Sequence, residues 1–311
     1  MLVRQLVHPI QESAVSETAG APYSRECWLV HPIQESAVSD VILCAYVEAL
    51  YLYHATNVPR DDYAPFTNYK VWHHTNPVGT EWRWKTDNAD DILREALENH
   101  YQMIKQFRGV PGVQADKLAE GMNAQHCALS LVGEPIMYPK INDLVRLLHQ
   151  KKISTFLVTN AQFPDAIRAL IPVTQLYVSV DAGSKEELKR IDRPLFRDFW
   201  QRYLDSLEAL GEKSQRTVYR LTLVKDWNVD QLEGYISLVK RGDPDFIEVK
   251  GVTYCGESKA STLTMVNVPW HEEVMEFVSQ FVGHLSDYEV ACEHEHSNCV
   301  LIAHKRVSEQ A

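Results

Sequence analysis

Apolar residues recur first at helical spacing and then in short strand-like runs from residue 87 onward. The first stripe predicts a helix capped by Asp87 and extending to Phe107, and a Gly-Val-Pro-Gly turn at 109–112 ends it. Short apolar runs then predict strands at 128–132, 155–159, 175–181, 217–225, 246–253, 288–294 and 299–304. Amphipathic segments between them predict helices at 140–150, 164–170, 196–207, 229–240 and 270–285.

Two four-residue patterns mark helix starts between these strands. Ser184 followed by Glu187, and Asn228 followed by Gln231, have the spacing of a capping box, in which two side chains satisfy free N–H groups at the start of a helix. We therefore expect one helix to begin directly after Ser184 and another directly after Asn228.

The alternation of strands and helices predicts an α/β fold with a mostly parallel sheet, because parallel neighbours need a crossover connection. Two architectures satisfy this pattern, an open doubly wound sheet and a barrel. In both of them ligands bind beyond the carboxyl ends of the strands, so the candidate site residues are those that end or follow the strands.

Residues 1–70 differ from the rest of the chain. The segment Leu6–Ser16 recurs letter for letter as Leu29–Ser39, and two copies are too few to stack into a repeat fold. Such an isolated duplication is typical of a duplicated exon or a gene-model artefact. We therefore expect a weakly ordered segment at 1–70, with one short helix at 40–53, followed by a single folded domain at 71–311.

Charge and cysteine content narrow the class of protein. The 311 residues carry 31 basic and 42 acidic side chains, so the net charge of −11 excludes a protein that coats nucleic acid and confines any RNA contact to a local basic patch. Six cysteines without regular spacing indicate reduced thiols. The apolar stretch Val41–Ala55 contains Glu48 and is too short to span a bilayer, and residues 1–4 do not resemble the start of a signal peptide. We expect a cytoplasmic protein.

A Gly-Glu-Pro turn follows the strand expected at 128–132. Glycine lets the backbone approach a ligand closely and the Glu134 carboxylate can hold an ammonium group, so this turn indicates a ligand with an amino group. For Asn160 and Asp181, turn formation or helix capping explains the same residue types equally well. The candidates at the carboxyl ends of the strands are Gly133, Glu134, Thr159, Asn160, Ser179, Asp181, Lys225, Lys250 and Tyr254.

Two charged residues lie within apolar strands. Arg220 alternates with apolar neighbours and is expected to point into the interior and pair with a carboxylate, although an edge residue with its charge in solvent has the same pattern. An amine in the apolar strand around Lys250 can form an imine with a carbonyl substrate. The alternative for Lys250 is an ion pair with Glu248, two residues away.

Segments spread between His73 and Lys305 strongly resemble the catalytic domain of the eukaryotic tRNA 4-demethylwyosine synthases, which are radical S-adenosylmethionine (SAM) enzymes: HHTNPVGTEWRWK, HCALSLVGEPIMYP, FLVTNAQFP, QLYVSVDA, PDFIEVKGVTYCGES and CEHEHSNC. The resemblance selects the barrel, and implies an incomplete (β/α)6-type barrel that is open on one side. It implies that Gly133 and Glu134 hold the amino group of SAM. The other cofactor-binding residues that it implies, around the carboxylate and ribose, are Thr159, Asn160, Ser179 and Asp181, and we group Arg220 with them.

The same resemblance implies a reaction. The family joins two carbons of pyruvate to N1-methylguanosine next to the anticodon of tRNA-Phe, a step of wybutosine biosynthesis, with SAM and a [4Fe–4S] cluster as cofactors. A Schiff base between a lysine and pyruvate suits that chemistry. Lys250 is therefore the candidate catalytic residue.

The chain departs from the family pattern at the cluster. In the family, a Cys-x-x-x-Cys-x-x-Cys loop directly precedes the His-His-Thr-Asn-Pro segment and binds the cluster, whereas residues 64–72 here contain no cysteine. Residues 1–70 also show no resemblance to the FMN-binding, flavodoxin-like domain of eukaryotic members. We therefore expect that this chain does not complete the radical reaction alone.

The alternative function is a non-catalytic remnant that binds tRNA or partners of the enzyme. The basic residues offered for tRNA are Lys151, Lys152, Lys189, Arg190, Arg193 and Arg197, although solvated helix faces carry the same charges. A weaker third alternative is zinc at the run from Cys292 to Cys299, which also fits a row of hydrogen-bonding side chains along a strand. We expect no metal there.

Overall fold

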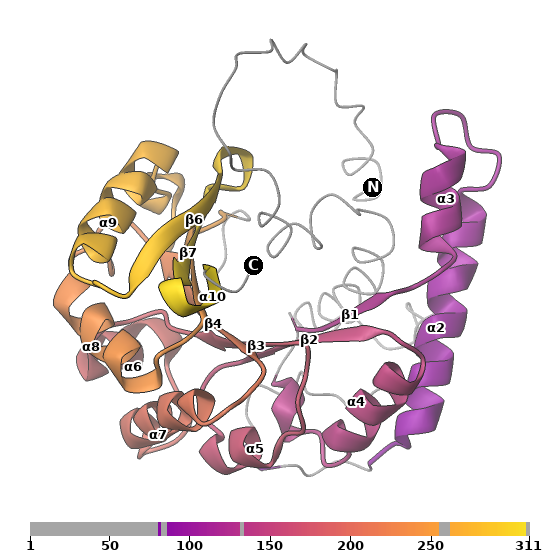
Figure 1. Ribbon diagram of the computed structural model, residues 1–311, viewed down its shortest axis with the longest axis horizontal. Coiled ribbons are helices and arrows are strands. Elements are labelled where there is room, and N and C mark those ends of the chain that lie inside the picture. The colour runs from indigo at the N-terminus through magenta and orange to yellow at the C-terminus, as the bar shows by residue number, and fades with distance from the viewer. Residues whose placement is uncertain (1–79, 82–85, 131–133, 255–261, 309–311) are drawn as a thin grey trace.

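The computed structural model describes residues 80–81, 86–130, 134–254 and 262–308. The segment 1–70, with its duplication and expected helix, lies outside the described residues, and so does Gly133. In the described part, a curved sheet carries a layer of helices on its outer side (Figure 1). No helix in that part is both long enough and apolar enough to cross a lipid bilayer.

The strands agree closely with the apolar runs of the sequence. They are β1 His126–Leu129, β2 Ser154–Thr159, β3 Gln175–Ser179, β4 Arg216–Leu223, β5 Phe246–Gly251, β6 Tyr288–His294 and β7 Cys299–His304. The helices are α2 Ala89–Gln106, α3 Ala115–Gly121, α4 Ile141–Gln150, α5 Pro164–Ala169, α6 Lys185–Asp192, α7 Phe199–Gly211, α8 Leu232–Gly242, α9 His271–Gly283 and α10 Lys305–Ser308. Short 3-10 turns are η5 Pro135–Met137, η6 Met265–Asn267 and η7 Glu295–Ser297.

The strand order β1-β2-β3-β4-β5-β7-β6 confirms a mostly parallel sheet. β1 to β5 pair in parallel through helical crossovers, and β7 then pairs antiparallel with both β5 and β6. Among the described strands, β1 and β6 are the two edges of the sheet and do not pair with each other. The sheet is therefore curved like a barrel wall and open, as the resemblance implies.

Each parallel strand has one face toward the helices and one toward the hollow of the sheet. The helix-facing residues, such as Leu157, Ile247 and Val249, belong to the large core beneath the helices. The opposite face holds a smaller apolar cluster that includes Tyr177, Val218, Phe246 and Leu301. We call this second side the concave face; candidate site residues that alternate with its apolar members project to the same side.

The helix starts agree with the sequence expectation at α6 and differ from it at α2 and α8, and the sequence did not predict α10. Ser184 does cap α6, because its Oγ accepts a hydrogen bond from the N–H of Glu187 at 3.4 Å. The predicted cap at Asp87 is wrong, since Asn88 occupies the N-cap position of α2, without a side-chain cap bond. The predicted start of α8 after Asn228 is also wrong, because the helix begins at Leu232. α3 was not predicted.

Asn228 is displaced from the cap because its amide serves the ends of two strands instead. Its Oδ1 accepts from the N–H of Val224 at 2.8 Å, and its Nδ2 donates to the carbonyls of Thr222 at 2.8 Å and Asp181 at 2.9 Å. Asn228 is 1% exposed, so its buried amide depends on these backbone groups for its hydrogen bonds. The side chain thereby joins the end of β4 to the end of β3.

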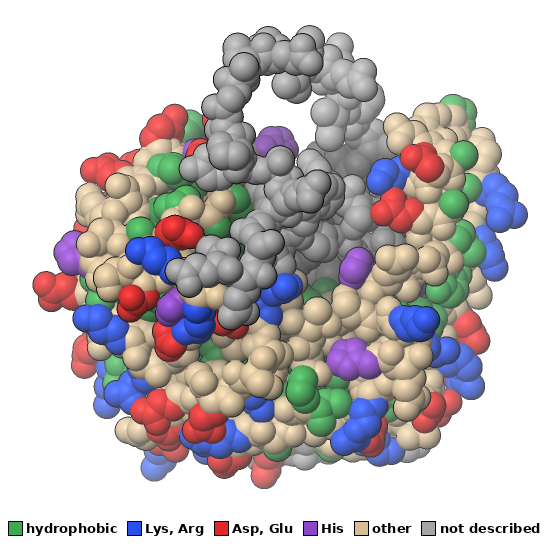
Figure 2. Space-filling model, in the orientation of Figure 1, with side chains coloured by type: hydrophobic (Ala, Val, Ile, Leu, Met, Phe, Trp, Pro, Cys, Tyr) green, Lys and Arg blue, Asp and Glu red, His purple; other side chains and the backbone are tan. Residues whose placement is uncertain are grey.

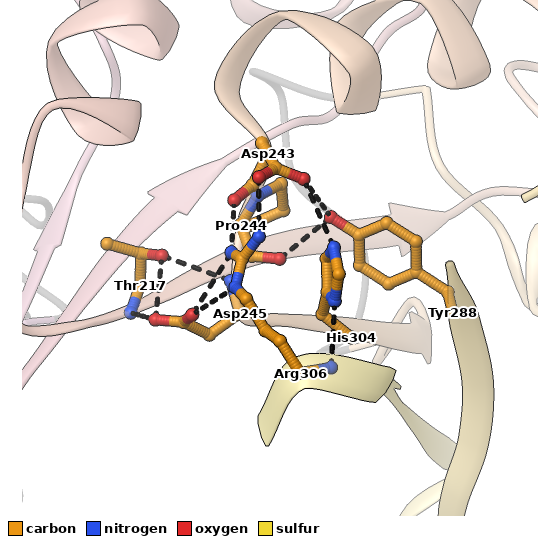
Figure 3. A network of polar contacts seen from close by, with 7 residues as sticks. All are labelled: Thr217, Asp243, Pro244, Asp245, Tyr288, His304 and Arg306. Atoms are coloured by element: carbon orange, nitrogen blue, oxygen red, sulfur yellow. Dashed lines mark hydrogen bonds and ion pairs between the residues drawn. The ribbon is translucent and has the colours of Figure 1, made fainter. Parts of the chain in front are cut away.

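At the edge where the parallel strands begin, Arg306 of α10 lies between two aspartates that precede β5 (Figure 3). Its guanidinium donates to Asp243 Oδ2 at 2.5 Å and to Asp245 Oδ1 at 3.1 Å, and also to the carbonyl of Asp243 at 2.7 Å. Asp245 Oδ2 in turn accepts from the N–H of Thr217 in β4 at 3.0 Å. The network therefore ties the end of the chain to the start of β4 and β5.

The antiparallel hairpin joins the same network (Figure 3). Tyr288 of β6 donates to the carbonyl of Pro244 at 2.8 Å, and its ring lies edge-on to His304 of β7. Nδ1 of His304 accepts from the N–H of Arg306, so in the neutral ring Nε2 carries the proton and faces Asp243 Oδ1 at 3.5 Å. We call this set the Arg306 clasp: Thr217, Asp243, Asp245, Tyr288, His304 and Arg306.

Candidate active site

The polar residues of the concave face form rows across neighbouring strands. Strand register places Ser179 beside Arg220 and Arg220 beside Glu248 in one row. One step nearer the carboxyl ends, Thr222 lies beside Lys250, which lies beside Cys299 of β7. The alternation that hides Ile247 and Val249 under the helices thus brings these groups to one side of the sheet.

Arg220 pairs with a carboxylate, as the sequence predicts. Its Nε lies 3.4 Å from Oε1 of Glu248, whose residue is only 8% exposed. Burial raises the pKa of Tyr177 on the adjoining strand, and the negative charge of Glu248 adds to this effect. The ion pair is therefore enclosed by aromatic and apolar neighbours rather than exposed at an edge.

Lys250 lies half-buried on the concave face, two residues beyond Glu248. The expected alternative, an ion pair between these two residues, is not formed, because Glu248 pairs with Arg220. Among the described residues Lys250 makes no ion pair at all. The amine therefore lies near the carboxyl end of β5, and no carboxylate in the described part of the chain pairs with it.

Glu134 follows β1 in the chain and lies next to the end of β2. Its residue is 6% exposed, and its Oε2 accepts a hydrogen bond from the N–H of Asn160 at 2.7 Å. The other oxygen, Oε1, is buried and accepts no hydrogen bond of normal geometry from the described residues, although the Thr159 hydroxyl and the Ile136 N–H lower the pKa of the carboxyl. Burial raises the pKa of Glu134 to about 7, against the opposing effect of the Asn160 N–H. An ammonium group beside Oε1 would satisfy this oxygen and restore the charge.

The residues at the end of β2 act on the local backbone. Thr159 is 1% exposed, and its hydroxyl accepts from the N–H of Ala161. Asn160 is exposed, and its Oδ1 accepts from the N–H of Gln162 at 3.2 Å. For Asn160 the turn-forming alternative therefore describes the side chain, while its backbone N–H holds the Glu134 carboxylate.

Ser179 and Asp181 lie at the end of β3, next to β4. Both are half-buried, and Ser179 faces Arg220 through the strand register. Burial raises the pKa of Asp181, opposed by a hydrogen bond from Thr222 and by the charge of Arg220. The structure therefore brings Ser179, Asp181 and Arg220 together. Asn160 follows the neighbouring strand β2, and Glu134 follows β1, one strand further along the sheet.

The run from Cys292 to Cys299 does not form a metal centre in the described structure. β6 ends at His294, and η7 turns the chain before β7 starts at Cys299. No group of three His, Cys, Asp or Glu residues that suits a metal ion occurs among the described residues. The third described cysteine, Cys127, lies on β1, distant from both of these strands in the sheet order.

Two positioning residues at the end of β5 escaped sequence reasoning. The N–H of Gly251 donates to the carbonyl of Asn298, and a methyl group on Gly251 would overlap the Asn298 amide. Asn298 Nδ2 donates to the carbonyl of Pro269 at 2.7 Å, which holds the chain before α9 against this strand end. The only sequence signal was Gly251 directly after Lys250, at a position where no larger residue fits.

Comparison with known families gives the class of protein. Residues 80–239, just over half of the chain, match the radical SAM superfamily, and residues 241–304 match the family described as wyosine base formation. The chain belongs to the radical SAM superfamily. Its open, mostly parallel sheet and its buried Glu134 at the end of β1 agree with that assignment.

Relatives within the superfamily are tRNA 4-demethylwyosine synthases. The chain is 71% identical to the S-adenosyl-L-methionine-dependent tRNA 4-demethylwyosine synthase TYW1 of Danio rerio over 234 residues, which are 75% of this chain and 32% of that protein. It is 69% identical to human TYW1B over 235 residues, 76% of this chain and 35% of that protein. The Oryza sativa enzyme is 63% identical over 74% of this chain and 36% of its own length. The chain thus spans about a third of these curated relatives.

Solved structures agree. A structure described as TYW1 with a lysine-pyruvate adduct bound superposes with a TM-score of 0.65 at 28% identity, over 71% of this chain and 70% of that one. Archaeal TYW1 gives a TM-score of 0.62 at 27% identity, over 73% and 74% of the two chains. The expected fold class and the resemblance to this family are therefore confirmed.

Proposed function

We propose that this chain carries the substrate-binding barrel of a tRNA 4-demethylwyosine synthase, in which pyruvate is joined to N1-methylguanosine next to the anticodon of tRNA-Phe. The observation that carries the proposal is the position of Lys250 at the carboxyl end of β5, where its amine has no carboxylate partner among the described residues. The description of a structural relative with a lysine-pyruvate adduct supports the same chemistry. We propose the cytoplasm as its compartment, in agreement with the irregularly spaced cysteines.

The imine step follows from the residues of the chain. The neutral amine of Lys250 adds to the keto carbon of pyruvate, the keto oxygen takes up protons and leaves as water, and a C=N bond replaces the C=O bond. Glu248, on the same face of β5, is held by Arg220 and keeps a negative charge near the forming iminium. Apolar neighbours such as Phe246 and Leu301 limit water on the inner side of this row.

The described residues fit SAM better than they fit its cluster. We propose that Glu134 holds the amino group of SAM through its unpartnered Oε1, with Asp181 and Ser179 beside the ribose. When bound, SAM and a [4Fe–4S] cluster supply hydrogen abstraction from the N1-methyl group. The described cysteines lie on β1, β6 and β7 and do not gather, which supports our proposal that this chain does not complete that step alone.

Reductive trapping tests the role of Lys250. We expect borohydride to fix labelled pyruvate on the 311-residue chain, and tryptic mass spectrometry to locate the adduct at Lys250. Lys250→Met should abolish this adduct, whereas the control Lys225→Met should retain it, because Lys225 is already engaged in an ion pair with Glu273. An adduct that persists in Lys250→Met would overturn the proposal.

Anaerobic iron–sulfide reconstitution tests the cluster. We expect no stoichiometric [4Fe–4S] signal by visible and electron paramagnetic resonance spectroscopy, with or without SAM. A stoichiometric signal that SAM perturbs would show that other ligands of this chain serve the cluster, and the proposed inability to react alone would then be wrong.

A further inference from the structure

The basic residues offered for tRNA divide between opposite edges of the sheet. Lys151 and Lys152 lie between the end of α4 and the start of β2, at the edge where the parallel strands begin. Lys189, Arg193 and Arg197 follow β3 and precede α7, at the edge where the parallel strands end. Only the second group is on the side of Lys250, Glu134 and Asp181.

The second group lies on the side of the candidate site and, like Lys151 and Lys152, makes no ion pair among the described residues. Among the described residues, exposed cations of α6 and of the connection to α7 make no ion pair; they are Lys185, Lys189, Arg193 and Arg197, which we call the α6–α7 cation cluster. Most other described arginines pair with carboxylates: Arg94, Arg146, Arg168, Arg190, Arg202, Arg220, Arg241 and Arg306.

The α6–α7 segment has a net positive charge, whereas the whole chain has a net negative charge. Residues 185–202 contain six basic and four acidic side chains, while the whole chain has a net charge of −11. On the face seen in Figure 2, the described acidic and basic side chains are intermixed, as expected for a surface of paired charges. A run of unpaired cations beside the candidate site is therefore a local feature.

Side-chain contacts hold this connection against neighbouring loops. Arg190 donates to the carbonyl of Trp227 at 2.9 Å and lies 5.8 Å from the centre of its ring, in the loop after β4. Arg202 lies 3.9 Å from the centre of the Phe196 ring and donates to the carbonyl of Gln162, in the loop after β2. Both loops are at the carboxyl edge of the sheet, so the cations project from a fixed rim.

Arg193 ends α6 in a left-handed conformation, with φ of 48°, where glycine is the usual residue. A non-glycine residue is sterically strained there. This conformation terminates the helix and lets the chain turn toward Arg197.

We propose that the α6–α7 cation cluster binds the phosphate backbone of the tRNA whose base enters the site near Lys250. The inference rests on the proposed function and adds the surface that positions the RNA. Leu195 is the only exposed large apolar residue described in 185–202, so the surface lacks the apolar centre of a protein interface. Unpaired cations on a fixed rim are instead suited to phosphates, which need charge without apolar contact.

Charge reversal in matched pairs tests this surface. The variant Arg193→Glu/Arg197→Glu changes two exposed cations at the carboxyl edge, and the control Lys151→Glu/Lys152→Glu changes two exposed cations at the opposite edge. Each pair contains one left-handed residue, Arg193 or Lys152, so the backbone cost is matched. Circular dichroism and thermal melting check that both variants fold.

The measurement is fluorescence anisotropy of a labelled tRNA-Phe transcript with the full chain, repeated over a salt series. We expect the first variant to weaken binding at least about tenfold and to lower the salt slope by about 2, since each phosphate contact contributes about 1 to that slope. The control should change affinity less than about threefold. Equal losses in both variants, a loss in the control alone, or no RNA binding by the unmodified chain would overturn the inference.

The tRNA-binding test and the pyruvate-trapping test at Lys250 can succeed or fail independently of each other. Pyruvate trapping at Lys250 requires no RNA, and RNA binding requires no imine. A chain that forms the Lys250 adduct but binds tRNA equally well with Arg193 and Arg197 reversed would retain the proposed function and refute this surface. A chain that binds tRNA through the cluster without an adduct would do the opposite.

Discussion

At the edge where the parallel strands begin, the polar side chains of the Arg306 clasp satisfy one another, whereas at the edge where the strands end, several polar side chains remain unsatisfied by the described residues. Arg306 has hydrogen bonds to both Asp243 and Asp245. At the other edge, Oε1 of Glu134 is buried without a partner, and Lys250 has no carboxylate partner among the described residues. The same sheet therefore uses polar residues as a structural clasp at one edge and leaves them available for ligands at the other.

The difference has a physical cause. In a barrel of parallel strands, the loops that begin the strands can be closed by internal contacts, while the loops at the carboxyl ends surround the ligand. A buried polar group without a partner costs about 1–3 kcal/mol, so such groups are retained where a ligand repays the cost. Substitutions at the two edges should therefore change the free energy of unfolding by amounts that differ in sign as well as in size.

Asn228 tests whether the carboxyl edge also contains residues that only stabilise. Asn228→Ala removes three hydrogen bonds to buried backbone groups, and we expect a loss of about 4 kcal/mol of unfolding free energy. Urea denaturation followed by circular dichroism measures the loss. The control Asn160→Ala removes one bond from an exposed side chain and should cost less than about 1 kcal/mol. Equal, small losses would show that Asn228 does not hold the ends of β3 and β4.

Removing the charge of Glu134 should increase the free energy of unfolding, in contrast to the loss expected for Asn228→Ala. Because its pKa is raised from 4.5 to about 7, the folded state favours the protonated carboxyl, so the stability contributed by this group is fully present below pH 4.5 and is lost as the pH rises through 7. Glu134→Gln keeps an acceptor for the Asn160 N–H without the charge. We expect it to stabilise the chain at pH 8 by about 3 kcal/mol and to change little at pH 4.5.

Thermal melting of both chains between pH 4.5 and 8 measures this effect. The exposed Glu276→Gln serves as the control and should leave the pH profile of the melting temperature unchanged. If Glu134→Gln melts in parallel with the unmodified chain at every pH, the burial of an unpaired carboxylate is not what destabilises this edge.

The sequence was informative about the fold because the parallel strands are rich in buried apolar residues. All seven expected strands occur, and each differs by at most a few residues from the apolar runs. The helix starts were predicted less well, since Asn228 can cap a helix or bind strand ends, and only the folded chain decides between them. α3 has too short an apolar pattern to be recognised in advance.

The sequence predicted the positions of the candidate site residues better than it predicted their hydrogen-bond and ion-pair partners. Strand ends and alternation located Glu134, Asp181 and Arg220. Whether Glu248 pairs with Arg220 or with Lys250, however, depends on the strand register. Register is a property of two paired strands and cannot be determined from the sequence of either strand alone. The roles in ligand binding remain predictions, to be decided by the trapping and binding measurements.

The Arg306 clasp should contribute less to the free energy of unfolding than Asn228 does, but more than a single surface ion pair does. Arg306→Ala removes contacts to two aspartates, and we expect a loss of about 2 kcal/mol, reduced by partial exposure to solvent. Arg241→Ala is the matched control, because both arginine side chains are 38% exposed while Arg241 has one ion-pair partner, Glu208. Its expected loss is about 0.5 kcal/mol. Equal losses measured by urea denaturation would refute the cooperative network.

Ser184 should give the smallest effect, because its cap bond to Glu187 is long, at 3.4 Å, and α6 has only eight residues. We expect Ser184→Ala to cost about 0.5–1 kcal/mol, and Ser184→Asp to cost nothing, since a carboxylate replaces the acceptor and favours the positive end of the helix dipole. Because α6 carries the cation cluster, tRNA affinity should fall in Ser184→Ala only as far as the helix frays. A loss of affinity without any loss of helical stability would place Ser184 itself in contact with the RNA.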